Sequence, residues 1–388
     1  MLRKGPENHT LPAPADQGRV PRNGRFRRPG ATLIEVPFVL PPEILVRVHR
    51  GGRVESEHRG DVAIVESGGS LLASCGDPDR GVFVRSAAKP FQALPFLAAG
   101  GARRFRLGDD EIALMCASHG GEPRHVRLAG RMLSKGGFSE DDLVCGAHLP
   151  LHEPSARALL RRGAEVSPLH NNCSGQHAAL LLSCRLFGFS PRGYEAPGHP
   201  LQQRIRESFA VYAGVPADSL EIAVDGCGIP VFYLPLSSLA RAYARLMARR
   251  QPGESVEDLR ARALVVRAMW ESPAMVAGQG RFTTELLQAG KRRWVGKEGA
   301  EGVYAIGLRP RRPGKRPVGI AFKIEDGSSR GRDAVSLALL DRLGYLDDVA
   351  RRRLAAHETI PISNAAGRVV GRIEATVPPL RMRDNPRA

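Results

Sequence analysis

A serine and a lysine lie three residues apart in the segment Val84–Leu97, which reads VRSAAKPFQALPFL. Ser86 and Lys89 would share one face of a helix, so the hydroxyl and the amine could meet without help from a distant residue. A serine beside an amine is a nucleophile beside a base. The apolar run after Lys89 predicts a buried helix start, where desolvation would lower the pKa of the lysine. The alternative is a lysine that only solvates a helix surface, because S-x-x-K is a short pattern.

Four further stretches contain side chains that can do chemistry. They read CASHGGEPRH at 116–125, HNNCSGQH at 170–177, DGCGIP at 225–230 and VAGQGRFTT at 276–284. The first breaks a predicted helix beside Ser118, and taken alone it is typical of a glycine-capped helix end. The second places Cys173 at a predicted helix N-terminus, where a thiol is easily engaged. Lys297 follows the fourth stretch, just before a predicted strand.

Strands at both ends of the chain and helices between them must position these groups. Clustered or alternating Val, Ile and Leu predict an antiparallel hairpin or meander over 38–84, and strands return at 302–308 and 318–324. One sheet built from both ends implies an α+β fold class, an antiparallel sheet with a large helical insertion. The expected helices cover 109–118, 124–134, 153–162, 174–187, 200–212, 236–249, 255–270 and 332–343.

The predicted organisation is one large domain between two tails. Residues 1–32 are rich in Arg, Pro and Gly without apolar periodicity, which predicts a disordered basic tail rather than a transit peptide. The domain covers 33–378, with a sheet subdomain at 33–85 and 290–378 and a mainly helical subdomain at 86–289. Residues 379–388 form a second predicted tail.

The net charge of +17 raises the question of nucleic-acid binding. Residues 1–30 hold seven basic and two acidic residues, and 291–316 hold nine and two, so these segments account for +12 of the charge. Neither segment interleaves aromatic and basic residues as a surface for single strands does. We therefore expect a solvated, Arg-rich surface and no nucleic-acid partner.

The cysteine pattern and hydropathy bear on location. The six cysteines form no C-x-x-C pair and no secretory signal precedes them, which favours a reducing, cytoplasmic location. No apolar run approaches the length of a membrane span, so no membrane association is expected.

Six motifs identify a family resemblance. RSAAKPFQALP, CASHGGEP, HNNCSGQHA, DGCGIPVF, AGQGRFTT and KEGAEGVYAIG occur in the order found in Rhizobium-type L-asparaginases. The chain resembles this family over about residues 33–378, and the family's fold is similar to that of serine β-lactamases. The resemblance implies a homodimeric enzyme that hydrolyses L-asparagine, a small-molecule substrate, through a serine acyl-enzyme. The alternatives are another amide, peptide or β-lactam hydrolase of the same fold, and a binding protein with an eroded site.

The resemblance also implies roles for two serines and two lysines. Ser86 would be the nucleophile and Lys89 its base, and Ser118 and Lys297 would form a second pair beside the first. Two nearby lysines suppress each other's protonation, so one neutral amine could take the Ser86 proton.

Free asparagine needs partners for its ammonium and its carboxylate. Asp225 is the candidate for the ammonium, and Arg85 is the candidate for the carboxylate through a bidentate contact. Arg281 is a weaker candidate. Each of the three could instead form a structural ion pair.

The family has a zinc site beside the serines, made of two cysteines and a lysine. Cys173 and Cys227 match the cysteines, but Gln176 stands at the lysine position. An amide oxygen suits zinc less well than an amine nitrogen. Both a weakened zinc site and two buried free thiols are compatible with these residues, so zinc is expected to be weak or absent. Thr283 stands where the family often has Asp, which bears on substrate orientation.

Overall fold

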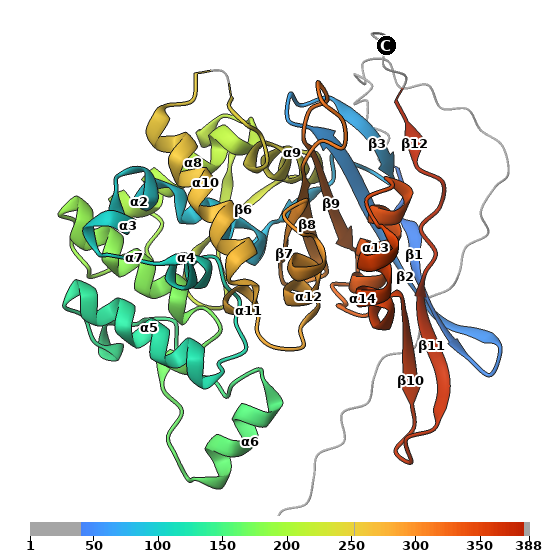
Figure 1. Cartoon of the computed structure of the whole chain (residues 1–388), viewed down its shortest axis with the longest axis horizontal. Helices are drawn as coiled ribbons and strands as arrows, with labels where there is room; N and C mark the ends of the chain where they lie inside the picture. Colours follow the sequence, from blue (N-terminus) through green and yellow to red (C-terminus); the bar gives the residue numbers. More distant parts are fainter. Residues whose placement is uncertain (1–39, 252, 384–388) are drawn as a thin grey trace, which may run out of the picture. The chain divides into compact units, whose positions relative to one another are not determined.

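The computed structural model describes residues 40–251 and 253–383, so the tail predicted at 1–32 lies outside the described residues. An antiparallel sheet of nine strands has helices on both of its faces (Figure 1). The strands are β1 (Glu43–Arg50), β2 (Arg53–Glu66), β3 (Leu71–Cys75), β4 (Gly81–Phe83), β5 (Glu221–Val224), β6 (Pro230–Pro235), β7 (Trp294–Glu298), β8 (Val303–Leu308), β9 (Val318–Ile324), β10 (Thr359–Ser363), β11 (Val369–Ala375) and β12 (Arg381–Met382).

Most helices lie between β4 and β7 in the chain. The α-helices are α1 (Lys89–Gln92), α2 (Leu94–Ala98), α3 (Gly101–Arg104), α4 (Asp109–Met115), α5 (Pro123–Gly136), α6 (Glu153–Arg161), α7 (Ser174–Phe187), α8 (Pro200–Ala213), α9 (Leu236–Leu246), α10 (Val256–Glu271), α11 (Pro273–Val276), α12 (Phe282–Ala289), α13 (Arg332–Arg342) and α14 (Asp348–Glu358). Short 3₁₀ helices are η1 (Arg85–Ala88), η2 (Glu140–Asp142), η3 (Pro168–His170) and η4 (Ala217–Ser219).

The large sheet joins the two ends of the described chain. Its strand order is β10-β11-β1-β2-β9-β8-β7, and β3 pairs with β2 and with β12. N-terminal β1 and β2 therefore lie between C-terminal β11 and β9, and both of these junctions are antiparallel. The predicted α+β fold class, with one sheet built from both ends around a helical insertion, is confirmed.

The sheet separates two hydrophobic cores. Along β2, Ala63 belongs to the cluster on the side of the helical insertion, whereas Val62 and Ile64 belong to the cluster beneath α12, α13 and α14. This alternation follows from the two-residue period of a strand, which sends successive side chains to opposite faces. Both faces are buried, which explains the near-continuous apolar run in the second half of β2.

Two paired glycines let α9 lie directly on the sheet. Gly307 of β8 is opposite Gly319 of β9. A Cβ at Gly319 would lie 1.8 Å from the Ala240 carbonyl oxygen, and a Cβ at Gly307 would lie 2.4 Å from that of Tyr243. Any side chain at either position would push α9 off the sheet, because the obstacles are backbone atoms.

The structure contains strands that the sequence patterns did not predict. β6 pairs with both β4 and β5 in a second sheet of three strands, and β5 and β6 lie inside the range predicted to be mainly helical. Short apolar runs of four to six residues do not distinguish a strand from a buried helix segment. Within the predicted tail 379–388, Arg381 and Met382 pair with Ser74 and Ala73 of β3. Backbone pairing holds this short strand although its own side chains are exposed.

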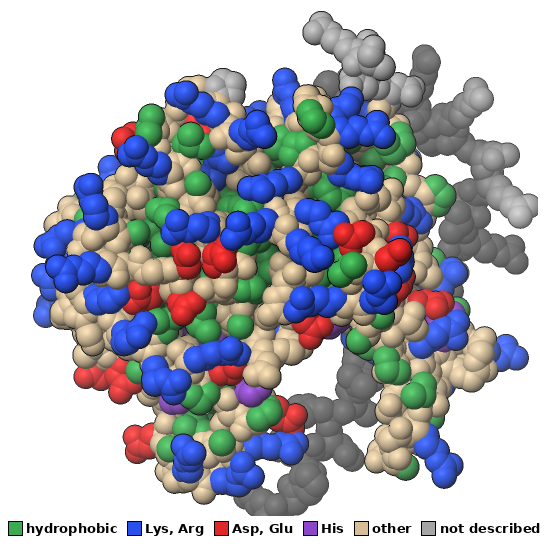
Figure 2. All heavy atoms as spheres, viewed as in Figure 1, with side chains coloured by type: hydrophobic (Ala, Val, Ile, Leu, Met, Phe, Trp, Pro, Cys, Tyr) green, Lys and Arg blue, Asp and Glu red, His purple; other side chains and the backbone are tan. Residues whose placement is uncertain are grey.

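Basic side chains are spread over the whole face seen in Figure 2, with fewer acidic ones between them. None of the helices within 40–251 and 253–383 is both long enough and apolar enough to cross a membrane.

Candidate active site

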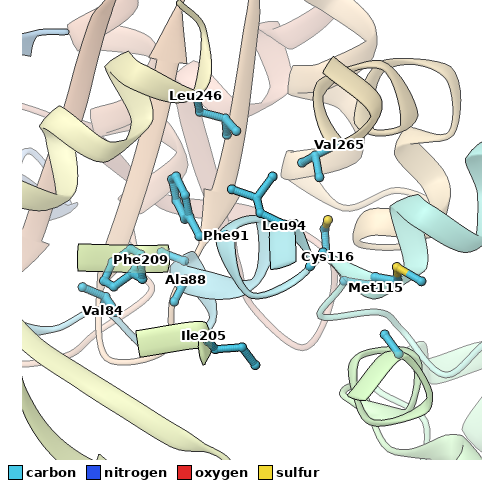
Figure 3. Packing of buried hydrophobic residues seen from close by; sticks show 14 of the residues in the cluster. Val84, Ala88, Phe91, Leu94, Met115, Cys116, Ile205, Phe209, Leu246 and Val265 are labelled. Atoms are coloured by element: carbon cyan, nitrogen blue, oxygen red, sulfur yellow. The ribbon is translucent and has the colours of Figure 1, made fainter. Parts of the chain in front are cut away.

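The S-x-x-K segment lies at the seam between the small sheet and the helices. Ser86 belongs to η1, and Lys89 is the first residue of α1, where the next residue is a proline that a first helical turn tolerates. Figure 3 shows Val84, Ala88, Phe91 and Leu94 of this segment among buried residues of the hydrophobic cluster. The aromatic ring of Phe91 lies 5.3 Å from that of Phe209, centroid to centroid. This packing leaves the segment little freedom to move.

Backbone strain occurs immediately before the candidate nucleophile. Arg85 has a φ of 49°, in the left-handed region that non-glycine residues seldom adopt. Such strain costs on the order of 1–3 kcal/mol and persists only where surrounding contacts enforce it. Here Val84 N donates to Phe232 O of β6 (3.0 Å), which ties the segment to the small sheet. The turn leaves Ser86 half-buried, and its hydroxyl has no hydrogen-bond partner among the described residues.

Lys89 contacts a different serine from the one predicted. The side chain is 2% exposed, and Nζ donates to Ala117 O (2.7 Å), Cys173 Sγ (3.0 Å) and Ser118 Oγ (3.3 Å). No hydrogen bond joins Lys89 Nζ to Ser86 Oγ within the described part of the chain. Helical spacing put the two residues on one face, but the lysine is long enough to reach past its neighbour toward Ser118 and Cys173. The role of Lys89 as the base for Ser86 stays a prediction.

Ser118 lies between the two lysines. Lys297 is the fourth residue of β7, opposite Ala305 of β8, and its side chain is fully buried. Lys297 Nζ lies 3.0 Å from Ser118 Oγ, so this hydroxyl contacts both amines. The backbone N–H of Ser118 donates to Val276 O (3.0 Å), which fixes the loop after α4. The structure therefore brings together three of the four predicted catalytic side chains.

The two lysines differ in their surroundings. Burial lowers the pKa of Lys297 to about 8, and the nearby charges of Lys89 and Arg281 act in the same direction against the opposing effect of Glu298. Burial acts in the same sense on Lys89, but the Cys173 and Cys227 sulfurs outweigh it, so the pKa of Lys89 lies above its ordinary value and the lowering predicted from the sequence is wrong. Lys297 is therefore the amine that can be neutral near physiological pH.

Glu298 is a buried carboxylate that the sequence patterns did not single out. It accepts hydrogen bonds from Thr283 Oγ1 and from Arg281 Nη2 (3.2 Å), and its Oε1 lies 3.4 Å from Lys297 Nζ. Burial would raise the pKa of Glu298, but Lys297 and Arg281 outweigh it and lower the pKa to about 2. Arg281 also donates to Ser118 O (3.0 Å), so the structure gives it a positioning contact. Direct sequence adjacency to Lys297 is the signal that could have identified Glu298.

Replacing Glu298 by glutamine is expected to destabilise the fold by about 3 kcal/mol, because removing one partner of a buried ion pair leaves the other charge unpaired. The carboxylate stabilises the fold above the ordinary Glu pKa of 4.5, and this contribution is lost as the pH falls toward 2. The variant should therefore lose less stability than the native chain between pH 4.5 and pH 3. Denaturant unfolding at several pH values measures both effects, and an unchanged free energy of unfolding at pH 7 would contradict the prediction.

His119 connects the Ser118 loop to the start of α7. Gly121 N donates to His119 Nδ1 (3.1 Å), so the ring proton is on Nε2, which donates to Ser174 Oγ (3.0 Å). Burial holds the pKa of His119 well below its ordinary value. His119 directly follows Ser118, and Ser174 directly follows Cys173. A neutral, buried imidazole therefore connects the two segments that contain Ser118 and Cys173. Its position next to Ser118 was the only sequence signal for this role.

The two charged residues predicted to bind opposite ends of the substrate contact each other. Arg85 Nη2 and Nε lie 2.7 and 2.9 Å from Asp225 Oδ1. The pair is partly exposed, and Asp225 begins the turn between β5 and β6. The structural ion pair that the sequence left open is therefore present, and it lies directly beside Ser86.

The sulfur cluster does not form a conventional zinc site. Cys227 hydrogen-bonds to Cys173, and with Lys89 this lowers the pKa of Cys173 to about 5 despite burial. Gln176 Nε2 donates to Gln92 Oε1, while Gln176 Oε1 is buried and has no hydrogen-bond partner among the described residues. No group of three or more His, Cys, Asp or Glu side chains suited to a metal occurs in 40–251 or 253–383. A third strong donor is missing and the Lys89 ammonium contacts the Cys173 sulfur, so weak or absent zinc binding stays the prediction.

Restoring a lysine at position 176 is expected to increase zinc retention. The variant Gln176→Lys would offer an amine nitrogen beside Cys173 and Cys227, whereas the native chain should lose zinc on mild dialysis. Mass spectrometric metal analysis of zinc-loaded protein after dialysis against a chelator makes the comparison. Gln203→Lys, which adds a lysine on α8 at an exposed hydrogen-bonding position, is the control. Equal zinc content in native and Gln176→Lys protein would contradict the prediction.

Comparisons with known proteins give a family for the chain. Solved structures that match include a Bacillus subtilis glutaminase in covalent complex with 5-oxo-L-norleucine (13% identity, 73% of this chain and 86% of that chain, TM-score 0.34). The protein Mglu in its native form also matches (18% identity, 80% of this chain and 70% of that chain, TM-score 0.40). The comparison with curated proteins found no match. The family model described as L-asparaginase II matches residues 46–375, and the chain therefore belongs to the L-asparaginase II family of amidohydrolases.

Proposed function

We propose that this chain hydrolyses L-asparagine to L-aspartate and ammonia through a serine acyl-enzyme. The observation that carries the proposal is the position of Ser118 Oγ between Lys89 Nζ and Lys297 Nζ, in a chain of the L-asparaginase II family. A hydroxyl between one charged and one neutralisable amine is suited to moving a proton. Ser86 supplies the nucleophile because its hydroxyl is half-buried and free, whereas Ser118 is buried and engaged.

The proposed acylation step uses these four side chains. Ser86 Oγ attacks the side-chain amide carbon of asparagine, and its proton passes through Ser118 to neutral Lys297 Nζ. The protonated Lys297 then returns a proton to the amide nitrogen, the C–N bond breaks, and ammonia leaves. Lys89, whose pKa is raised, remains charged and stabilises the negative charge that develops during attack. In deacylation, water attacks the ester carbon and gives a proton to neutral Lys297 Nζ, the bond to Ser86 Oγ breaks, and Ser86 Oγ regains the proton through Ser118 as aspartate leaves.

Recognition of the amino acid uses the Arg85–Asp225 pair. Asparagine at neutral pH carries an ammonium and a carboxylate, so it can exchange with both members of the pair at once. The substrate carboxylate takes the place of Asp225 at Arg85, and the substrate ammonium takes the place of Arg85 at Asp225. This exchange leaves no uncompensated charge in a partly desolvated site, which favours a free amino acid over an uncharged amide.

Ammonia release from L-asparagine, L-glutamine and a peptide asparagine, together with ring opening of a β-lactam followed by absorbance, tests the proposal. We expect turnover with L-asparagine and much lower turnover with L-glutamine, an internal asparagine of a peptide, and a β-lactam. The peptide lacks both free charges, so it separates recognition by Arg85 and Asp225 from reactivity. Faster turnover of another of these compounds would show that asparagine is not the preferred substrate. Binding of asparagine in calorimetry without release of ammonia would indicate a binding protein with an eroded site.

A further inference from the structure

A basic pocket lies away from the site of the two lysines, at the opposite end of β7 from Glu298. The pocket has a volume of about 480 Å³. Its lining residues are Arg293, which directly precedes β7, residues 309–311 after β8, and residues 344–347 between α13 and α14. We name it the Arg309 pocket. Volumes of this size accommodate small organic ligands.

The pocket has more positive charge than its own residues compensate. Arg293 Nη1 lies 2.8 Å from Asp347 Oδ2, so these two residues neutralise each other. Arg309 and Arg311 also line the pocket, and among the described residues neither has a carboxylate within ion-pair distance. Two arginines that have no anionic partner among the described residues therefore line one concave surface.

Other contacts fix both unpaired arginines. The guanidinium of Arg309 lies over the ring of Trp270, 4.4 Å from its centroid, and Arg309 O accepts a hydrogen bond from Tyr345 Oη (2.7 Å). Arg311 Nη1 donates to Leu343 O (3.3 Å). A Cβ at Gly344 would lie 2.3 Å from Arg311 Nη1, so the glycine makes room for this guanidinium. The positive charges are held in place before any ligand arrives, which lowers the entropy cost of binding one.

The surroundings of Arg309 also favour an anion. Burial lowers the pKa of Arg309, and the charges of Arg292 and Arg249 act in the same direction. Arg292 is paired with Glu271, but Arg309 has no such partner in the described chain. An anion in the pocket would offset this repulsion, so binding would relieve an unfavourable arrangement of charges.

We propose that the Arg309 pocket binds a polyanion with two adjacent phosphate groups, either inorganic diphosphate or the phosphates of a nucleotide. Arginine presents a planar fork of N–H donors that matches phosphate oxygens bidentately. Two arginines on one pocket suit two neighbouring phosphates better than a single carboxylate. This site is separate from the proposed hydrolysis of asparagine and does not depend on it.

Calorimetric titration of the full chain with diphosphate, ATP and citrate at 150 mM NaCl tests the proposal. We expect saturable binding of diphosphate or ATP, reduced at least about tenfold in Arg309→Gln and in Arg311→Gln. The matched control is Arg312→Gln, which removes the same charge from an exposed neighbour outside the pocket and should change binding less than about twofold. Arg311→Lys keeps the charge but loses the fork, and we expect it to bind more weakly than the native chain.

The arms of the titration separate the possible results. Tighter binding of ATP than of diphosphate would support a nucleotide as the ligand, and equal or weaker binding of ATP would support inorganic diphosphate. Tighter binding of citrate than of both would overturn the phosphate assignment. Equal losses of binding affinity in Arg309→Gln, Arg311→Gln and Arg312→Gln would overturn the proposed binding site, because they would show attraction to net charge alone. The absence of saturable binding by all three probes would also overturn it. Circular dichroism of each variant confirms that the fold is intact.

Discussion

The variant Ser86→Ala is expected to lose asparagine hydrolysis by a factor on the order of 10⁴ or more, as serine hydrolases do when the nucleophile is removed. The fold should be unaffected. Ser86 Oγ has no hydrogen-bond partner among the described residues, and alanine fits the same turn, so the melting temperature should change little. Coupled ammonia assays and thermal unfolding of native and variant protein measure the two quantities separately.

Two comparisons make the Ser86 prediction specific. Ser190→Ala removes an exposed serine from the loop after α7 and should leave turnover unchanged. Ser118→Ala should also lower turnover strongly, because it interrupts the contact with both lysines, but it keeps the nucleophile. Peptide mapping of enzyme quenched during turnover should therefore find the aspartyl ester on Ser86. An ester found on Ser118, or near-native turnover by Ser86→Ala, would show that the assignment of the nucleophile is wrong.

The rate of the chemical step is expected to rise with pH through an apparent pKa near 8, the value that burial and neighbouring charges give Lys297. The proton acceptor is the neutral amine. Below pH 8 the neutral fraction falls about tenfold per pH unit, and kcat should fall with it. The profile is read from kcat rather than kcat/KM, because the ammonium group of free asparagine titrates in the same range and enters kcat/KM. Lys297→Met should lower kcat by about 10²–10⁴ and remove this dependence.

A change at Glu298 tests the direction in which this carboxylate shifts the pKa of Lys297. Glu298 raises the pKa of Lys297, so Glu298→Gln should move the alkaline rise of kcat to lower pH. The reverse direction, or an unchanged midpoint, would show that Lys297 is not the group that titrates. The measurement uses protein at a temperature well below the lowered melting temperature of the variant, so that the loss of stability predicted above does not enter the rates.

The six motifs and the helical periodicity were readable from the sequence because they depend on residues close together in the chain. α7 begins and ends where its pattern predicts, at Ser174 and Phe187. The apolar run after Lys89 also predicted correctly that this lysine lies at a buried helix start. Local backbone preferences act over a few residues, so elements with a clear apolar period and a capping glycine can be predicted from sequence alone.

The partner of Lys89 was decided only by tertiary structure. Ser86 is three residues away in the sequence, yet the amine contacts Ser118 and Cys173, which are 29 and 84 residues away. A lysine side chain can reach in many directions, and the packing of α4 and α7 around it selects one. The Arg85–Asp225 ion pair spans 140 residues and depends in the same way on how β6 pairs with β4 and with β5.

Lys297 shows most clearly which features follow from local sequence patterns and which depend on tertiary structure. The sequence places this lysine in a family motif just before a predicted strand at 302–308, whereas the structure places it inside β7. Only the antiparallel register of β7 with β8, which sets Lys297 opposite Ala305, decided that this amine faces Ser118, 179 residues earlier in the chain. Burial and the charges of residues from other elements then lower its pKa. Such contacts depend on sheet register and on long-range packing, and no local pattern in the sequence records either of them.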